Sequence, residues 1–432
     1  EQLNWLIDIG ETMARKYWVT CTNPPYAGTS NLSANVNNFV KKNYPDSKAD
    51  LFAVFIERCR QMTVNNGFQA MITQHAWMFL SSFEKLREKM MLTETVNMAH
   101  LGARAFEEIG GEVVQTTAFV RCANHVEGYK GTYCRLIEPT SQQGKADMFI
   151  SGQNQYRVGQ ISFSKIPGVP VAYWISPEVL KLFDERTVGS IADAKSGMTD
   201  NTRFLRLWEE VNCQKIGFGY GNIADTQDMK YKWFPFCKGG DFRRWAGNES
   251  FVVNWFNNGE EIRIAAEGAT GGRLVNIDCA LRECLVWTKI SSANISLRMK
   301  KQGIFFSDAA PGVFANRETL YYLLALLNTK YANEIIKLIN PTLNFVPGAV
   351  SSVPVKKDEK NKGKIIEIAE GNVQLSEQDW DSFETSWDFK KHPLLQNVST
   401  ISEAFNQWQA ECDDRFNQLK TNEEELNRIF ID

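Results

Sequence analysis

The stretch Tyr17-Trp18-Val19-Thr20-Cys21-Thr22-Asn23-Pro24-Pro25-Tyr26 decides the fold of the first part of the chain. Its first five residues favour a β-strand, because β-branched and aromatic side chains fit a pleated surface. The strand has to stop at Pro24 and Pro25, because proline cannot donate a ladder hydrogen bond. The sequence therefore predicts a strand that ends in a stiff, proline-fixed bend.

Helices and strands alternate after this bend. The predicted elements are a helix at 50–58, a strand at 67–73, a helix at 82–87, and strands at 96–101 and 116–121. Apolar residues recur at helical spacing in the first helix, and Asp50 is placed to cap it. This alternation is typical of a doubly wound α/β sheet.

The pattern changes from about residue 161 onward. Short mixed segments punctuated by glycine follow, closed by a predicted helix at 319–340. Residues 358–432 have a helical pattern from about Ser402 and carry 17 acidic but only 8 basic residues. We therefore expect three domains, at 1–160, 161–357 and 358–432, the last being an acidic, mainly helical tail.

Composition excludes several classes of protein. A chain of 432 residues with 43% hydrophobic and 23% charged residues is an ordinary globular protein. No apolar run approaches the ~18 residues that a bilayer requires, and a secretory signal is not apparent, so a cytoplasmic protein is expected. The nine cysteines contain no Cys-x-x-Cys pair, so we predict no metal site. A net charge of −3 does not exclude nucleic acid, because binding needs positive charge only locally.

Asn23-Pro24-Pro25-Tyr26 resembles the catalytic motif of amino-group DNA methyltransferases, and the Asn form implies N6 of adenine. An exocyclic amine is a poor nucleophile, so the enzyme must accept its hydrogens; the Asn23 side-chain oxygen and the Pro24 carbonyl suit this role. Pro25 helps to stiffen the loop, and Tyr26 can stack on a base taken out of the duplex. The alternative is a rigid turn with Tyr26 as a core aromatic.

Three further residues fit this pattern less specifically. The resemblance implies that Phe106 stands where γ-class adenine methyltransferases place a second aromatic on the flipped base, although a core phenylalanine is an equal alternative. His75 and Trp77 follow a predicted strand and could line the cleft. We favour a hydrogen-bonded histidine and a packed tryptophan at these two positions.

The glycine-rich turn that holds S-adenosylmethionine is not found before the motif. Only Gly10 precedes Asn23, and the chain begins with Glu1 rather than Met. We therefore interpret the chain as a fragment whose cofactor-binding half lies upstream of Glu1. Gly217-Phe218-Gly219-Tyr220-Gly221 is a downstream alternative, but a polar segment precedes it, so a loop of the recognition domain is preferred.

The remaining motifs identify the relative more closely. Residues 197–205 and 233–245 resemble target-recognition domains, and 379–389 matches the PglX-type methyltransferases of BREX phage-defence systems. This resemblance implies the fold class: an α/β, partial Rossmann-like methyltransferase sheet, then a mixed α+β target-recognition domain and a helical tail. It also makes 1–160 the C-terminal half of the catalytic domain and 161–357 the DNA-binding domain.

Four basic residues are candidates for contact with double-stranded DNA: Lys232, Lys238, Arg243 and Arg244. They would bind phosphates or guanine edges, and the alternative is a solvated basic loop. Other phage-defence proteins or a phage inhibitor are further possible partners, and the acidic tail is expected to pack on the protein or on a partner. The hypothesis is a site-specific adenine-N6 DNA methyltransferase; the rivals are a non-catalytic recognition or inhibitor-docking module and an RNA or protein-glutamine methyltransferase.

Overall fold

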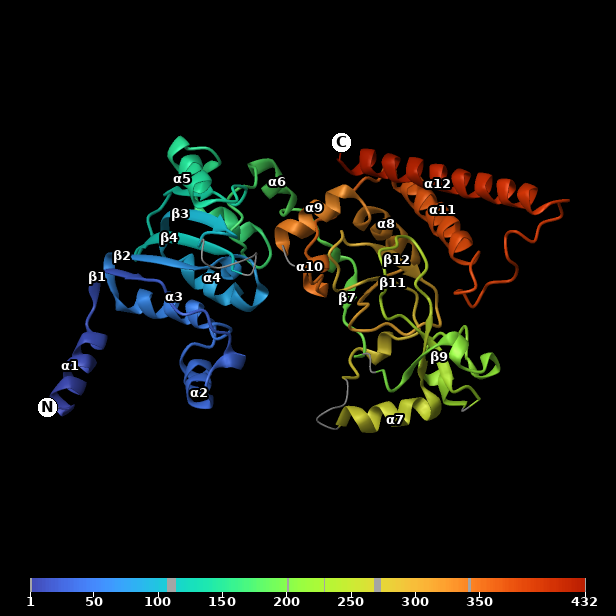
Figure 1. The fold of residues 1–432 in the computed structure, drawn as a ribbon, viewed down its shortest axis with the longest axis horizontal. Helices are drawn as coiled ribbons and strands as arrows, with labels where there is room; N and C mark the ends of the chain where they lie inside the picture. Colours follow the sequence, from blue (N-terminus) through green and yellow to red (C-terminus); the bar gives the residue numbers. More distant parts are fainter. Residues whose placement is uncertain are drawn as a thin grey trace. The chain divides into compact units, whose positions relative to one another are not determined.

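The computed structural model describes residues 2–106, 114–199, 202–228, 230–267, 273–340 and 343–431. The chain divides into two compact units, residues 1–184 and 185–432 (Figure 1). Each unit has its own sheets and its own hydrophobic core. The catalytic, recognition and tail roles assigned to 1–160, 161–357 and 358–432 stay predictions.

The first unit is built on a six-stranded sheet of order β1-β2-β4-β3-β5-β6. The strands are β1 (Tyr17–Thr22), β2 (Thr63–Gln74), β3 (Glu94–Gly102), β4 (Thr116–Cys122), β5 (Gly131–Arg135) and β6 (Gln155–Val158). β1 pairs parallel with β2, β3 pairs parallel with β5, and β4 runs antiparallel between β2 and β3. The carboxyl ends of β1, β2, β3 and β5 therefore lie at one edge of the sheet.

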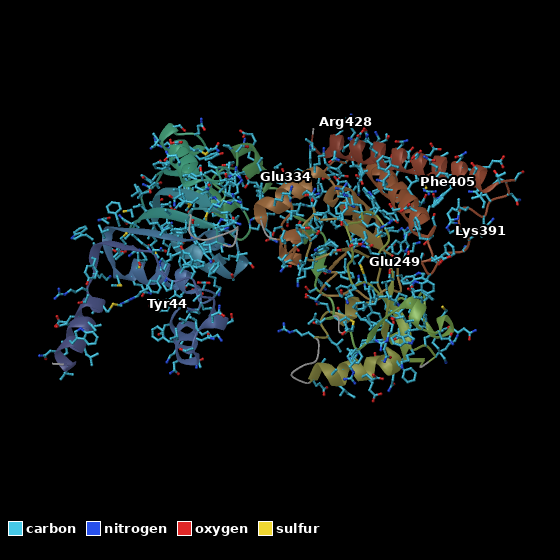
Figure 2. The ribbon with its side chains drawn as sticks, viewed as in Figure 1. Tyr44, Glu249, Glu334, Lys391, Phe405 and Arg428 are labelled. Atoms are coloured by element: carbon cyan, nitrogen blue, oxygen red, sulfur yellow. The ribbon has the colours of Figure 1, made fainter. Side chains whose placement is uncertain are left out.

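Two helices, at 51–62 and 84–90, pack on one face of this sheet. The helices of the unit are α1 (Gln2–Ala14), α2 (Ala34–Asn43), α3 (Leu51–Met62), α4 (Glu84–Met90), α5 (Gln142–Ser151) and α6 (Pro177–Leu182). Phe52 and Ile56 of α3 form a core with Met71, Phe119 and Tyr133 of the strands. α2 is held to α3 by a smaller cluster that contains Tyr44, which Figure 2 labels.

The opposite face of the sheet carries small side chains. An open cavity of about 770 Å³ borders this face, and Ala70, Ile72, Ala99, Ala118, Val120 and Thr132 are among its lining residues. β1 is the edge strand on this side of the unit and pairs only with β2 among the described residues. Its Trp18 and Val19 side chains are 69% and 60% exposed. The sheet is thus packed on one face and open on the other.

The second unit contains two small antiparallel sheets, of order β8-β10-β9 and β12-β11-β13-β7. Their strands are β7 (Asp193–Lys195), β8 (Leu205–Leu207), β9 (Trp233–Phe236), β10 (Phe251–Asn254), β11 (Cys284–Trp287), β12 (Leu297–Lys300) and β13 (Gly312–Phe314). α7 (Phe256–Glu267) contributes Ile262 to the core below the first of these sheets. Long loops join these elements, as the glycine-rich sequence predicts.

The helix predicted at 319–340 is wrong as a single helix. The structure has α8 (Arg317–Leu327) and α9 (Lys330–Ile339) in its place. The break occurs because the Asn328 side chain hydrogen-bonds both the N–H and the C=O of Leu297 on β12. The Thr329 hydroxyl then accepts from Ala332 N and caps the second helix. Tertiary hydrogen bonds here override an unbroken apolar pattern.

The acidic tail folds onto the second unit. After α10 (Pro347–Ser351), the helices α11 (Lys362–Trp380) and α12 (Ile401–Ile431) pack on each other, and α11 packs along α8 (Figure 1). The α/β fold class, with its partial sheet, mixed second region and helical tail, is confirmed. No described helix combines the length and the apolar character that crossing a membrane would require.

Candidate active site

The Asn23–Tyr26 bend lies at the carboxyl end of β1, as predicted. β1 ends at Thr22, and the next residues leave the ladder because Pro24 and Pro25 lack an N–H. Asn23 and Pro25 are exposed, Pro24 is buried, and Tyr26 is half-buried. The Asn23 side chain is therefore accessible while the bend itself is anchored.

Tyr26 links the exposed and buried parts of the bend. Its hydroxyl donates to the Asn23 side-chain oxygen at 3.3 Å. Its ring meets Phe52 of α3 edge-on, with the ring centroids 6.1 Å apart. Burial raises the pKa of Tyr26, so the phenol stays protonated and keeps its role as donor. Tyr26 thus packs against the core and also touches the Asn23 amide.

Asp50 fixes the far end of the bend. Its Oδ1 atom accepts from the backbone N–H groups of Ala27, at 3.0 Å, and Phe52, at 3.3 Å. The predicted N-cap of α3 is confirmed. In addition, Leu51 N donates to Ala27 O at 3.1 Å. One carboxylate therefore joins the bend to the first turn of the helix that packs against the sheet.

There is room beside Asn23. The residue borders the 770 Å³ cavity on the open face of the sheet, together with Ile72, Ala99 and Ala118 from the neighbouring strands. These side chains are small or aliphatic, so the cavity is shallow and mostly apolar near the amide.

The structure gives different environments to Trp77 and Phe106, two of the less specific candidates for the cleft. Trp77 is 1% exposed, its Nε1 donates to Thr73 Oγ1 at 3.0 Å, and it packs against Phe119, so it is a core residue. Phe106 is half-buried in the loop after β3, and the neighbouring residues 107–113 are outside the described ranges. Its stacking role stays a prediction.

His75 belongs to a chain of buried polar groups that the sequence analysis did not find. Its Nδ1 lies 2.8 Å from Nε2 of His100, and Nδ1 of His100 lies 3.0 Å from the Tyr173 hydroxyl. Burial lowers the pKa of His75 to about 4 and that of His100 to about 3. Tyr173 is 98 residues from His75 and lies in no sequence motif. The usable signal was that His75 follows the predicted strand at 67–73 and His100 lies near the end of the one at 96–101.

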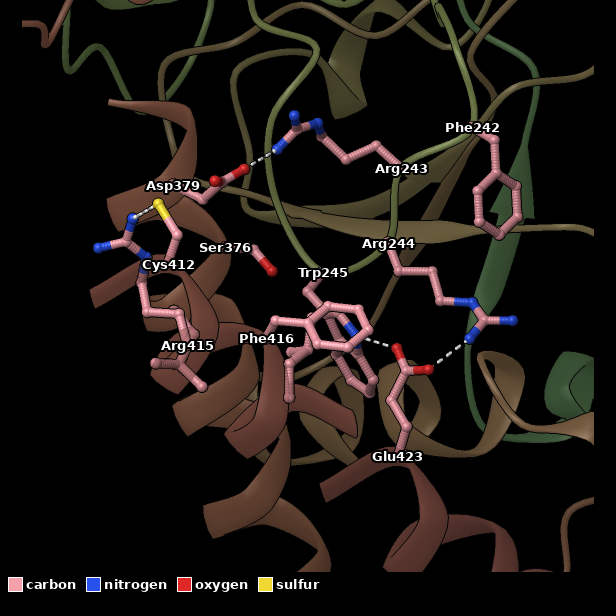
Figure 3. A pocket seen from close by; sticks show the side chains of 12 residues that line it. Phe242, Arg243, Arg244, Trp245, Ser376, Asp379, Cys412, Arg415, Phe416 and Glu423 are labelled. Carbon is pink, nitrogen blue, oxygen red and sulfur yellow. Dashed lines mark hydrogen bonds and ion pairs between the residues drawn. The ribbon is translucent and has the colours of Figure 1, made fainter. Parts of the chain in front are cut away.

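The four predicted DNA contacts do not share one environment. Lys232 is exposed over the ring of Trp233, and Lys238 is half-buried over Phe251. Arg243 is paired with Asp379 of α11 at 2.9 Å, and Arg244 with Glu423 of α12 at 2.7 Å (Figure 3). The tail carboxylates thus engage both arginines, as the expectation that the tail packs on the protein implies. Whether any of the four contacts DNA stays a prediction.

The order of elements in the first unit bears on where S-adenosylmethionine could be held. β1 is the first strand, and no glycine-rich turn leads from an earlier strand into a helix in the described part of this unit. Gly217 to Gly221, the downstream alternative, follows the short 3-10 turn Cys213–Lys215 and not a strand, so it is a loop.

Comparisons with known proteins place the sequence and the fold among restriction-modification enzymes. Residues 1–102 match the family model described as Eco57I restriction-modification methylase. The fold resembles the Type IIL restriction-modification enzyme MmeI in complex with DNA, with a TM-score of 0.55 and 12% identity over 94% of this chain and 54% of that one. A second structural neighbour is the Type ISP restriction-modification enzyme LlaBIII bound to DNA, with a TM-score of 0.50 and 9% identity over 85% and 30% of the two chains. The fold therefore resembles that of restriction-modification enzymes.

The predicted resemblance to PglX-type methyltransferases in particular is confirmed. The chain is 44% identical to the adenine-specific methyltransferase PglX of Lacticaseibacillus casei (strain Zhang), over 100% of this chain and 37% of that protein. It is 35% identical to the adenine-specific methyltransferase BrxX of Escherichia coli O9:H4 (strain HS), over 97% and 34%. The chain thus spans little more than a third of the length of these curated relatives.

Proposed function

We propose that the chain supplies the target-base loop and the DNA-recognition part of a site-specific adenine-N6 DNA methyltransferase. The observation that carries this proposal is the placement of Asn23: exposed, beyond the carboxyl end of β1, beside open space, and fixed through Tyr26 and Asp50. Ligands of open α/β sheets bind at such an edge. The names of both curated relatives agree with the adenine specificity.

In this proposal, the bend prepares the amine for reaction. The Asn23 side-chain oxygen and the Pro24 carbonyl accept the two amino hydrogens of the target adenine. An amide oxygen has two lone pairs, so Asn23 can accept from the amine while Tyr26 continues to donate to it. Because prolines and Asp50 hold the loop, these acceptors need little reorganisation during the reaction. The Tyr26 ring stacks on the flipped base.

S-adenosylmethionine supplies the methyl group in this class of enzyme. We propose that residues outside this chain bind it, because the described residues lack the required turn. The edge of β1 supports this view, because β1 has no second neighbour among the described residues and a further strand could pair with it. The greater length of the curated relatives leaves room for such a half. This chain then contributes the groups around the base, not those around the cofactor.

Contact with double-stranded DNA falls, in this proposal, to the 232–244 segment of the second unit. Lys232 lies over the ring of Trp233 and Lys238 over that of Phe251, which limits the freedom of both side chains. Both structural neighbours named above were solved with DNA. Arg243 and Arg244 each use one terminal nitrogen for a tail carboxylate, which neutralises part of their charge and leaves other N–H groups for a phosphate. We therefore assign the first contact to Lys232, and further contacts to Lys238, Arg243 and Arg244.

The decisive experiment measures methylation and DNA binding together. In the enzyme that contains this chain together with the cofactor-binding half, Asn23→Ala is expected to reduce duplex methylation at least 100-fold, as loss of a preorganised polar group does in other enzymes. Duplex affinity should stay within about 2-fold. Asn38→Ala is the matched control, because Asn38 is an exposed asparagine on α2. Equal activity of Asn23→Ala and the control would refute the catalytic role.

The same assay separates the rival functions. A wild-type protein that binds duplex DNA but transfers no methyl group to any substrate would be a recognition or docking module. Methyl transfer to RNA or to a glutamine side chain, with none to duplex DNA, would assign the Asn23–Tyr26 bend to those substrates. The DNA proposal requires methylated adenine in a duplex.

A further inference from the structure

Two carboxylates of the acidic tail pair with two of the four basic residues assigned to DNA. Asp379 of α11 lies 2.9 Å from a terminal nitrogen of Arg243, and Glu423 of α12 lies 2.7 Å from one of Arg244. Lys232, by contrast, has no ion pair among the described residues. The effective positive charge of the 232–244 segment is therefore smaller than the number of its basic residues indicates.

Both ion pairs line one open cavity at the surface of the second unit. The cavity has a volume of about 360 Å³ and is bordered by the 242–245 loop, α11 and α12 (Figure 3). The side chains of Arg243 and Asp379 are 30% and 44% exposed, and those of Arg244 and Glu423 are 21% and 25% exposed. Solvent and ligands can therefore reach all four charged groups.

A phosphate that binds either arginine meets the paired carboxylate at short range. The nitrogen-to-oxygen distances of 2.7–2.9 Å are much shorter than the screening length of about 10 Å at 0.1 M salt. Salt therefore does not separate the two charges of a pair. Because the carboxylate repels the phosphate while the guanidinium attracts it, the net attraction is weaker than that of an unpaired arginine.

The shape of the 242–245 loop does not depend on the charge of the tail. The backbone N–H of Trp245 donates to Leu297 O at 2.9 Å, and its carbonyl accepts from Met299 N at 2.8 Å, so β12 holds the loop. Glu423 adds an acceptor for Trp245 Nε1 at 2.8 Å. An amide oxygen at the same place can accept the same hydrogen bond. Charge and hydrogen bonding can therefore be separated by isosteric substitutions.

We propose that Asp379 and Glu423 are built-in counter-ions that weaken the sequence-independent attraction of the second unit to the DNA backbone. They act by cancelling part of the charge on Arg243 and Arg244. The proposal rests on the DNA-binding role that the proposed function gives to the 232–244 segment. Non-specific binding is almost entirely electrostatic. The tail therefore limits how much of the enzyme is held on DNA that lacks the recognition site.

The first test measures binding of the enzyme, with its cofactor-binding half, to a labelled mixed-sequence duplex. Fluorescence anisotropy at several salt concentrations gives the slope of log affinity against log salt. The Asp379→Asn/Glu423→Gln double variant is expected to bind more tightly at low salt, with a slope steeper by up to about 0.9 for each arginine. A slope change of about 0.9 corresponds to roughly 3.5-fold in affinity for each fourfold change in salt.

The Asp413→Asn/Asp414→Asn double variant is the matched control. It removes two negative charges as well, from exposed positions of α12 that have no ion pair among the described residues. A general effect of net charge would therefore appear in both double variants. Equal binding of the two would overturn the inference. Weaker binding by Asp379→Asn/Glu423→Gln than by the control would also overturn it, because the carboxylates would then orient the arginines for DNA.

The second test asks whether Glu423 acts through Arg244. In the wild-type background, Arg244→Ala should change the slope only slightly, because the charge of Arg244 is already partly cancelled. In the Glu423→Gln background, the same substitution should reduce the steepness by about 0.9. Both backgrounds keep an acceptor for Trp245, so the loop is held in both. Equal changes in the two backgrounds would contradict the counter-ion role of Glu423.

Failure of the proposed function would look different from failure of this inference. If the wild-type enzyme binds no duplex DNA, or binds it with an affinity that neither salt nor Lys232→Ala alters, the 232–244 segment does not contact phosphates. The proposed DNA contact then fails, and the carboxylates have no phosphate to repel. If the wild type binds duplex DNA in a salt-dependent way, the double variants alone decide the inference.

Discussion

Arg244 and Glu423 are separated by 179 residues in the sequence, yet their side chains form an ion pair of 2.7 Å. The other oxygen of Glu423 accepts from Nε1 of Trp245 at 2.8 Å, so one carboxylate holds two consecutive side chains of the 242–245 loop (Figure 3). The same helix pair holds Arg243 through Asp379. The acidic tail therefore positions a loop whose basic residues are the ones predicted to contact DNA.

Two substitutions of Glu423 separate its charge from its hydrogen bond. Glu423→Ala removes both contacts and should lower the free energy of unfolding of the second unit by about 1–3 kcal/mol, because the Trp245 N–H loses its partner. Glu423→Gln keeps an acceptor for the Trp245 N–H, so it should lower the free energy of unfolding clearly less. Urea unfolding followed by tryptophan fluorescence measures both. Identical stability of Glu423→Ala and the wild type would contradict the role of the tail.

The basic residues of the second unit should differ in their effect on DNA binding. Lys232→Ala is expected to reduce the slope of log affinity against log salt by about 0.9, the value for one phosphate contact. Arg244→Ala should change the slope less, because its guanidinium is engaged by Glu423. Fluorescence anisotropy of a labelled duplex across salt concentrations gives both slopes. A larger change for Arg244→Ala would mean that the tail releases the arginine when DNA binds.

Asp50 offers a test of how the target-base loop is held. Asp50→Ala removes the acceptor for Ala27 N and the cap of α3, and should lower stability by about 1 kcal/mol and kcat by roughly 10-fold. Asp50→Asn keeps an oxygen at the same place, so it should retain most of the activity. Steady-state kinetics and thermal unfolding measure the two effects. Unchanged kcat in Asp50→Ala would show that the prolines alone fix the loop.

The buried histidines predict a loss of stability in acid. Burial holds the pKa of His75 at about 4 and that of His100 at about 3, against 6.5 for an ordinary histidine. Between about pH 6.5 and 4 the unfolded chain therefore binds protons that the folded chain does not. The stability that these two neutral histidines contribute is fully present above about pH 6.5. It declines as the pH falls, by up to about 1.4 kcal/mol per pH unit for each histidine.

The comparison with His75→Phe isolates this effect from the carboxylates that titrate in the same range. The variant should lose stability less steeply than the wild type between pH 6 and 4.5. Urea unfolding at several pH values gives the two slopes. Parallel slopes for the wild type and His75→Phe would contradict the burial of His75 as a neutral group.

Local patterns in the sequence predicted local structure well. The β-favouring run before Pro24 is β1, Asp50 is the cap of α3, and the predicted strands at 96–101 and 116–121 are β3 and β4. The order of the strands was not predictable in the same way, because β4 enters between β2 and β3 and no local signal gives strand neighbours. The break at Asn328 depends on Leu297, 31 residues earlier.

In the candidate site, too, contiguous residues were predictable and long-range contacts were not. Asn23, Pro24, Pro25 and Tyr26 are contiguous, so a motif could find them and the structure places them together. The pairing of Arg243 and Arg244 with tail carboxylates, and of His75 with His100 and Tyr173, arises only when distant segments fold together. Such contacts leave no spacing pattern in the sequence.

The bare edge of β1 has a practical consequence for anyone who purifies this chain by itself. A parallel edge strand with unpaired backbone groups and exposed Trp18 and Val19 side chains is a template for pairing with another copy. Preparations of the isolated polypeptide should therefore self-associate as concentration rises, and a lysine in place of Val19 should keep them monodisperse.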